Sequence, residues 1–98
     1  MKRDYTVIDN REKQRFEIHA EGHIAFEDYA LVDGGIAYLH TEVPPELGGR
    51  GIASFLIQYL LDDAAAKGLK VKPVCPVVRA YIEKHPEYQA NTVPWQDG

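Results

Sequence analysis

Hydrophobic and polar residues alternate along the first 43 residues with a period of two, which is typical of strands that bury one face. Alternating runs cover residues 5–7, 16–20, 23–32 and 36–43. Turn-forming residues separate them: the polar run 10–14, then Glu21-Gly22, then Asp33-Gly34-Gly35. Short connections of this kind join antiparallel neighbours. The pattern therefore predicts an antiparallel meander of four strands.

The period changes to that of a helix after Gly51. Apolar residues recur at spacings of three and four between Ala53 and Ala64, and only Ser54, Gln58 and Asp62 form a polar row. A helix that is apolar on most of its circumference packs against a sheet. We predict this helix from about Gly51 to Lys67, with Gly68 as its stop signal.

Two further elements complete the pattern. The run LKVKPVC predicts a fifth strand that ends at Cys75, and Pro76 opens a second helix, VVRAYIEKH, as proline does at a first helical position. The polar tail from Glu87 predicts no element, and Trp95 is expected to cap the edge of the core or to contact another chain. We expect one α+β domain, residues 1–98, with about five strands and two helices.

Length and charge narrow the classes of function. A chain of 98 residues supports one hydrophobic core. Its net charge of −4 and its lack of a Lys/Arg cluster argue against non-specific nucleic-acid binding. The single cysteine, Cys75, excludes an internal disulfide, and the polar start predicts neither a secretory signal nor a membrane span. We expect a cytoplasmic monomer or weak homodimer.

The connection into the first helix carries the strongest chemical signal. Pro44 and Pro45 end the fourth strand, and glycines occupy three of the four positions 48–51. Glycine lets backbone approach a ligand, and the free N–H groups at a helix start favour an anion. Arg50 adds a cation, and the Lys-Ser/Thr ending of a P-loop is missing. The alternative is a tight connection that needs glycine for its dihedral angles alone.

These residues resemble those of a known family. The segment from Glu46 to Gly51 is similar to the acyl-CoA pyrophosphate loop of the GNAT superfamily of N-acetyltransferases, Q/R-x-x-G-x-G/A, with Glu46 in place of Gln or Arg. Tyr81, followed by His85-Pro86, fits the spacing of the Tyr-x-x-x-Gly-Phe motif of that family. HTEVPPELGGRGIA, the strand ending in CP, and HPEY resemble its short single-domain branch.

The resemblance implies a cofactor and a set of contacts. Acetyl-CoA, or coenzyme A, would lie in a cleft between the fourth and fifth strands. Backbone groups near Val43 would bind the pantetheine arm and the thioester oxygen, Tyr81 would protonate or orient the CoA sulfur, and His85 is a further candidate contact. The residues implied for the pyrophosphate are Gly48, Gly49, Arg50, Gly51, Ile52 and Ala53.

Cys75, His40 and Glu42 are further candidates for a catalytic role. Cys75 has two interpretations: a nucleophile that takes the acyl group first, or a small residue that lines the site. His40 and Glu42 lie two apart on one face of the fourth strand and are candidate bases, although such residues more often lie at the surface or pair across strands. His19 and His23 have no partners at metal-ligand spacing, so we expect no metal.

The sequence therefore predicts an N-acetyltransferase that moves an acetyl group from acetyl-CoA to an amine, directly or by way of Cys75. The acceptor is not identified, and a protein amine or a small amine such as a polyamine fits an acidic chain. The first alternative is a module that binds CoA or acyl-CoA without turnover. The second is an interaction protein that keeps the fold and has lost the ligand.

Overall fold

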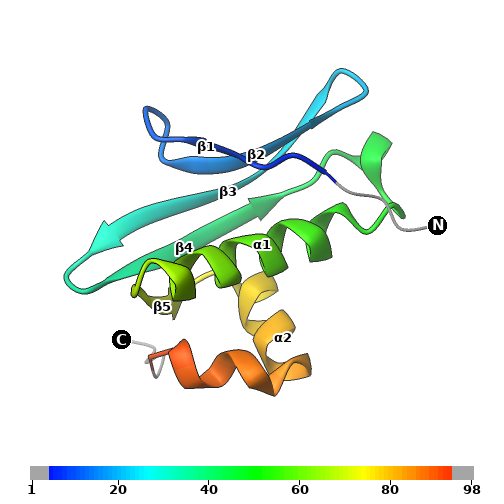
Figure 1. Ribbon diagram of the computed structural model, residues 1–98. Helices are drawn as coiled ribbons and strands as arrows, with labels where there is room; N and C mark the ends of the chain where they lie inside the picture. Colours follow the sequence, from blue (N-terminus) through cyan, green and yellow to red (C-terminus); the bar gives the residue numbers. More distant parts are fainter. Residues whose placement is uncertain (1–4, 94–98) are drawn as a thin grey trace.

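A computed structural model describes residues 5–93 and contains a five-stranded mixed sheet with two α-helices (Figure 1). The strands are β1 (Ile8–Asn10), β2 (Arg15–Ala20), β3 (His23–Val32), β4 (Gly35–Glu42) and β5 (Lys70–Pro73). The helices are α1 (Ile52–Ala66) and α2 (Pro76–Lys84), and the 3-10 helices are η1 (Pro45–Leu47) and η2 (Pro86–Asn91). Strands β1 to β4 are antiparallel, and β5 pairs parallel to β4. The predicted α+β fold, with a meander followed by a fifth strand, is confirmed.

All three predicted turns of the meander are present, each joining two antiparallel strands. Glu21 and Gly22, between β2 and β3, have φ values of 51° and 79°. Two consecutive residues with positive φ match the right-handed twist of the strands that they join. The sequence signal for these turns was local, which explains why the order of strands in the meander could be predicted from it.

Helix α1 packs across one face of the sheet, in front of the strands in Figure 1. Its buried residues meet aromatic and aliphatic side chains of β2, β3 and β4. The hydroxyl of Tyr38 on β4 donates to the backbone oxygen of Leu60 at 2.7 Å, which ties the helix to the sheet. Ser54, Gln58 and Asp62 are exposed. The predicted polar row is therefore the solvent face of α1.

Two boundaries differ from the sequence prediction: the fifth strand ends at Pro73 and not at Cys75, and the first strand starts later than predicted. The first strand is Ile8–Asn10, whereas the alternation predicted one from Tyr5. Tyr5 instead turns toward α1, where its ring packs edge-on against Phe55 at 5.4 Å between centroids. The pairing of β1 with β2 starts only at Ile8 opposite Glu17. The alternation at residues 5–7 thus reflects contact with the core and not strand pairing.

The segments around the helices are more structured than the sequence indicated. Leu47, in η1, is buried at 1% exposure, so the loop before α1 is anchored in the core. The tail, for which no element was predicted, forms η2 and then a parallel bridge between Thr92 and Val71. Trp95 lies outside the described residues. The outer edge of β5 is thus partly covered by the chain's own tail.

The close approach of β4 and β5 depends on Gly35. Gly35 pairs with Lys70, and a Cβ on Gly35 would lie 2.4 Å from the backbone oxygen of Lys70. Backbone cannot move aside as a flexible side chain does. Gly35→Ala is therefore expected to lower the free energy of unfolding by about 2 kcal/mol, measured by urea denaturation. A decrease in the free energy of unfolding of less than about 0.5 kcal/mol would contradict this prediction, because β4 and β5 could then move apart at little energetic cost.

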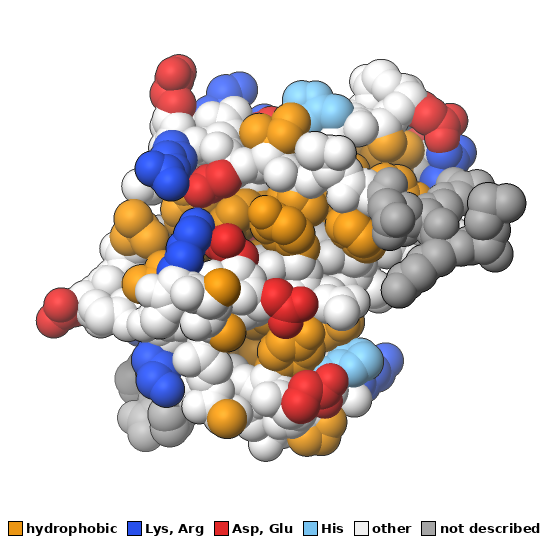
Figure 2. Space-filling view, in the orientation of Figure 1, with side chains coloured by type: hydrophobic (Ala, Val, Ile, Leu, Met, Phe, Trp, Pro, Cys, Tyr) orange, Lys and Arg blue, Asp and Glu red, His pale blue; other side chains and the backbone are white. Residues whose placement is uncertain are grey.

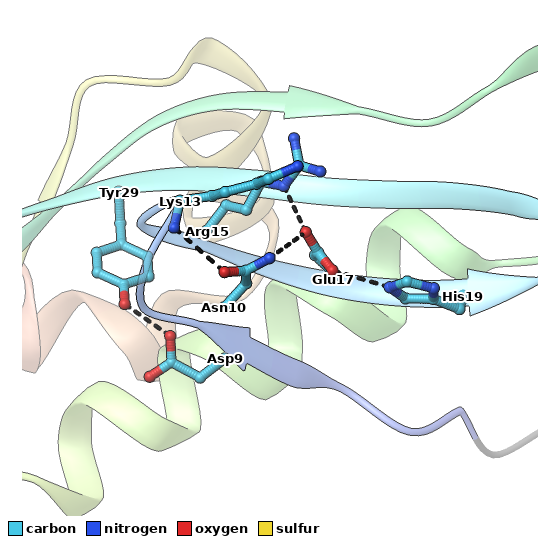
Figure 3. A network of polar contacts seen from close by, with 7 residues as sticks. All are labelled: Asp9, Asn10, Lys13, Arg15, Glu17, His19 and Tyr29. Carbon is cyan, nitrogen blue, oxygen red and sulfur yellow. Dashed lines mark hydrogen bonds and ion pairs between the residues drawn. The ribbon is translucent and has the colours of Figure 1, made fainter.

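The sheet face away from α1 carries a polar network (Figure 3). Glu17 on β2 is only 4% exposed, and its carboxylate accepts from Arg15 at 2.5 Å, from Asn10 at 3.0 Å and contacts His19 at 2.8 Å. Burial alone would raise the pKa of Glu17, but the hydrogen bonds from His19, Arg15 and Asn10 outweigh it and lower the pKa to about 2. Glu17 is held as a carboxylate at neutral pH.

Candidate active site

The N-terminus of α1 is open to a ligand. Gly51 is the N-cap of α1 with φ of 71°, and Gly49 has φ of 76°. A Cβ at either position would meet no atom of the described chain within 4 Å, so both face open space. The first N–H groups of a helix have no partner within it. Of the predicted anion-binding loop, these two positions need glycine, whereas Gly48 has an ordinary φ of −62°.

The β2–β3 hairpin holds this loop from the side. Arg50 forms an ion pair with Glu21, and Glu46 lies 3.9 Å from Nδ1 of His23. The hydroxyl of Tyr5 donates to the backbone oxygen of Arg50 at 3.3 Å. The Arg50 side chain, predicted as an added cation, is thus engaged by a carboxylate. Glu46, the departure from the family pattern, points to the hairpin.

A cavity of about 240 Å³ lies between α1 and α2, next to the loop. It is lined by Ala53, Ser54, Ile57, Val77, Ala80, Tyr81, Lys84 and His85. Three predicted cofactor contacts, Ala53, Tyr81 and His85, therefore share one cavity. Hydrophobic side chains and a histidine also lie side by side at the surface below α1 in Figure 2.

Tyr81 and His85 form a stacked pair inside this cavity. Their ring centroids are 4.1 Å apart with an interplanar angle of 25°, as expected for residues one turn apart on α2. Burial, followed by the charges of Asp62 and Glu87, raises the pKa of Tyr81. The hydroxyl therefore stays protonated at neutral pH, which a proton donor requires.

Strands β4 and β5 separate after a short paired stretch. Their register runs from Gly35 opposite Lys70 to Tyr38 opposite Pro73, and the backbone N–H of Cys75 then donates to the oxygen of Tyr38 at 2.8 Å. Within residues 5–93, no strand pairs with this side of β4 from Leu39 to Glu42. Val43 follows directly. The backbone predicted to hold the pantetheine arm thus lies where the two strands diverge.

Cys75 is the N-cap residue of α2 and has no exposed surface. Its Sγ lies 3.2 Å from Oγ1 of Thr41 on β4, and the Thr41 hydroxyl donates to Oε1 of Glu27 on β3. Cys75 does not line the cavity between α1 and α2. The thiol is instead the last member of a polar chain that crosses from β3 through β4.

Glu27 was not predicted as a site residue, although its position in the alternation of β3 indicated a buried acidic side chain. It lies in phase with Ala25 and Tyr29, the buried positions of β3, and is itself 0% exposed. Burial raises the pKa of Glu27 to about 7, against the opposing effects of the Thr41 hydrogen bond and the His40 charge. An acidic residue at a core position of an amphipathic strand is the pattern that could have identified it.

His40 and Glu42 lie on the other face of β4 from Thr41. His40 Nε2 is 2.9 Å from Glu42 Oε1, and this hydrogen bond raises the pKa of His40. Both side chains are more than half exposed. The structure does not bring them to Cys75, and their role as candidate bases stays a prediction.

The described part of the chain gives two further findings. No group of three or more His, Cys, Asp and Glu side chains that could hold a metal ion occurs within residues 5–93. His19 and His23, instead, lie next to the carboxylates of Glu17 and Glu46. Neither α1 nor any other helix in this range has the length and hydropathy that crossing a membrane requires.

Comparison with known proteins gives consistent results. Residues 15–91 match the family described as GCN5-related N-acetyl-transferase. Protein NATD1 of Mus musculus is 32% identical over 83 residues, which cover 82% of this chain and 76% of the relative, and NATD1 of Gallus gallus matches equally. The solution structure of a GCN5-like candidate N-acetyltransferase from Staphylococcus aureus superposes with a TM-score of 0.72 at 25% identity, covering 94% of this chain and 91% of that one. The fold, the open helix start and these matches together show that the chain belongs to the GCN5-related N-acetyltransferase family, the superfamily that its glycine loop resembles.

Proposed function

We propose that this protein binds acetyl-CoA and transfers the acetyl group to an amine. The observation that carries the proposal is the cavity between α1 and α2, because Ala53, Tyr81 and His85 line it beside the open start of α1. Membership of the family supports acetyl-CoA as the donor. The acceptor would be a protein amine or a small amine.

Each end of the cofactor has matching groups in this arrangement. The pyrophosphate would accept from the free N–H groups that follow Gly51, helped by the helix dipole. The pantetheine arm would run past Val43, where β4 has separated from β5. The thioester would then lie near Cys75, with the protonated hydroxyl of Tyr81 available to the departing CoA sulfur.

Substitution at Gly51 tests the phosphate end. A side chain at φ of 71° costs about 1–2 kcal/mol of stability and fills space that a phosphate would occupy. Losing one or two hydrogen bonds to a charged group costs about 1.5–3 kcal/mol. Gly51→Ala is therefore expected to weaken acetyl-CoA binding about tenfold or more, measured by calorimetry, and to leave the weaker binding of S-acetylpantetheine unchanged.

Gly34→Ala is the matched control for this variant. Gly34 lies in the β3–β4 turn with φ of 72°, and a Cβ there also meets nothing within 4 Å. It carries the same backbone strain without contact to the proposed site. Equal loss of acetyl-CoA affinity in both variants, or loss in neither, would contradict the proposed phosphate site.

Turnover separates the transferase from a module that only binds CoA. The full chain with acetyl-CoA and a panel of polyamines and lysine peptides should release free CoA, measured by chromatography, in proportion to acetylated amine. Binding of acetyl-CoA with no acetyl transfer to any amine would favour the binding module.

A further inference from the structure

A polar chain of three residues, with a half-buried Thr41 between a buried Glu27 and a buried Cys75, joins β3, β4 and the start of α2. Glu27 is 0% exposed and Cys75 is 0% exposed, and Thr41 lies between them with contacts to both. Oε2 of Glu27 has no hydrogen-bond partner within the described residues. An ionisable group in such a place is costly unless it is paired, and groups of this kind gather at functional sites.

The direction of the hydrogen bonds follows from the inventory of protons. Thr41 has one hydroxyl proton, which it donates to Oε1 of Glu27. In the contact of 3.2 Å between Thr41 Oγ1 and Cys75 Sγ, the hydroxyl oxygen is then the acceptor and the thiol the donor. When Glu27 is ionised, the Cys75 thiol donates to the Thr41 hydroxyl, and this hydroxyl donates to the Glu27 carboxylate. The chain is oriented to draw a proton away from Cys75.

We propose that Glu27 and Thr41 form a proton relay that deprotonates Cys75, which then takes the acetyl group from acetyl-CoA as a covalent thioester. This inference rests on the proposed function and chooses between its two routes. Buried cysteines are as a rule inert. The aligned carboxylate distinguishes this one, because a thiol becomes a nucleophile when an adjacent base removes its proton. Glu27 and Thr41 are positioning residues, and Cys75 is the group that meets the substrate.

The reaction balances in two steps. The Cys75 proton passes to Thr41 as the Thr41 proton passes to Glu27. The Cys75 sulfur bonds to the carbonyl carbon, and the bond from that carbon to the CoA sulfur breaks. The CoA thiolate takes the hydroxyl proton of Tyr81, which Tyr81 regains from solvent. The amine then attacks acetyl-Cys75, the carbon–sulfur bond breaks, and the amine releases its proton to solvent. The thiolate regains its proton from Glu27 through Thr41.

Burial of Cys75 fits this sequence of events. The thiol lies where β4 and β5 have just separated, since its own N–H bonds to Tyr38, the last residue of β4 that pairs with β5. The acetyl group reaches it when the pantetheine arm enters this gap. Until then solvent is excluded from the thiol, and an acetyl-Cys75 in the same position is shielded from hydrolysis.

The test uses the full chain and acetyl-CoA without an amine, with intact mass and peptide mapping as the readout. Because the sequence has one cysteine, a thioester-bound acetyl group reports Cys75. Wild type should gain one acetyl group at Cys75, and Cys75→Ala none. Glu27→Gln and Thr41→Val should slow the gain about 100-fold, the lower bound for general-base assistance. Thr41→Ser, which restores the hydroxyl, should stay within a few-fold of wild type.

The pH profile gives a readout that a purely structural role would not move. The titratable groups that act on Glu27 are Tyr38 on β4, and Asp28 on β3 and His40 on β4, which lie on the opposite face of the sheet; Thr41 is its hydrogen-bond partner. Wild-type acetylation should rise with pH through a midpoint near pH 7, where Glu27 is half ionised, and level off above it. In Glu27→Gln the profile should lack this midpoint, because glutamine does not titrate.

Failure of the relay and failure of the proposed function differ in outcome. If wild type binds acetyl-CoA and acetylates amines while Cys75 stays unmodified and Glu27→Gln keeps its rate and pH profile, the relay is overturned and the proposed function stands. If wild type binds no acetyl-CoA, or binds it and acetylates neither Cys75 nor any amine, the relay and the proposed function are both overturned. Each variant is first checked for unchanged acetyl-CoA affinity, so that a slower rate is not a binding defect.

Discussion

Wild-type protein is expected to lose about 3 kcal/mol of unfolding free energy, relative to Glu27→Gln, as the pH rises from 4.5 to 8. Each unit of pKa shift corresponds to about 1.4 kcal/mol. Burial raises the pKa of Glu27 from 4.5 to about 7, so the folded state holds a proton that the unfolded state has already lost. Stability from a group of this kind is fully present below pH 4.5 and is lost as the pH rises through 7. Glutamine does not titrate, so the difference isolates this carboxyl.

Urea denaturation of both proteins at pH 4.5, 6, 7 and 8 measures this effect. Glu83→Gln, the same chemical change at an exposed position of α2, is the matched control and should track wild type. Parallel curves for wild type and Glu27→Gln would show that Glu27 titrates as an ordinary surface carboxyl. The expected divergence also means that the relay variant is well folded at the alkaline pH where its acetylation rate is compared.

Glu17 is expected to behave in the opposite direction. Burial disfavours its charged form, but the hydrogen bonds from His19, Arg15 and Asn10 prevail and lower its pKa from 4.5 to about 2. A depressed pKa contributes stability above pH 4.5 that is lost as the pH falls through 2. Wild type should therefore exceed Glu17→Gln by about 3 kcal/mol at pH 7, and this difference should disappear between pH 5 and 2.

The check is urea denaturation of Glu17→Gln beside wild type at pH 7, 5, 4 and 3. Glu12→Gln, an exposed carboxyl in the β1–β2 turn, is the control for the loss of one surface charge. A difference that is small at pH 7, or that persists unchanged at pH 3, would contradict the assignment. Together the two carboxyls give the fold opposing pH dependences on either side of about pH 4.5.

Local signals carried much of the fold prediction. The β2–β3 turn was readable because Gly22 adopts the positive φ of the turn without steric cost, although Glu21 also has a positive φ. Helix α1 was readable because Ser54, Gln58 and Asp62 define its solvent face within a single segment. The start of the first strand was predicted wrongly from its pattern, because Tyr5 fits the alternation but packs on Phe55 from outside the sheet.

The candidate site divides in the same way. Tyr81 and His85 were proposed as cofactor contacts from their fit to the family motif, and the structure stacks their rings. His40 and Glu42 were correctly expected on one face of the fourth strand, but which face meets Cys75 depends on what packs there. Glu27 escaped notice because an acidic residue in a strand is most often a surface residue.

The sequence by itself determined the meander, the apolar helix, the glycine loop at its start and the family to which the chain belongs, because each of these is written in neighbouring residues. Only the tertiary structure decided which polar groups meet. Thr41 lies 14 residues from Glu27 and 34 residues from Cys75 in the chain. Their contact exists because β5 follows α1 back to the edge of β4 and then diverges from it, which brings the thiol to Thr41. Such encounters are set by packing over long sequence separations, and no local pattern encodes them.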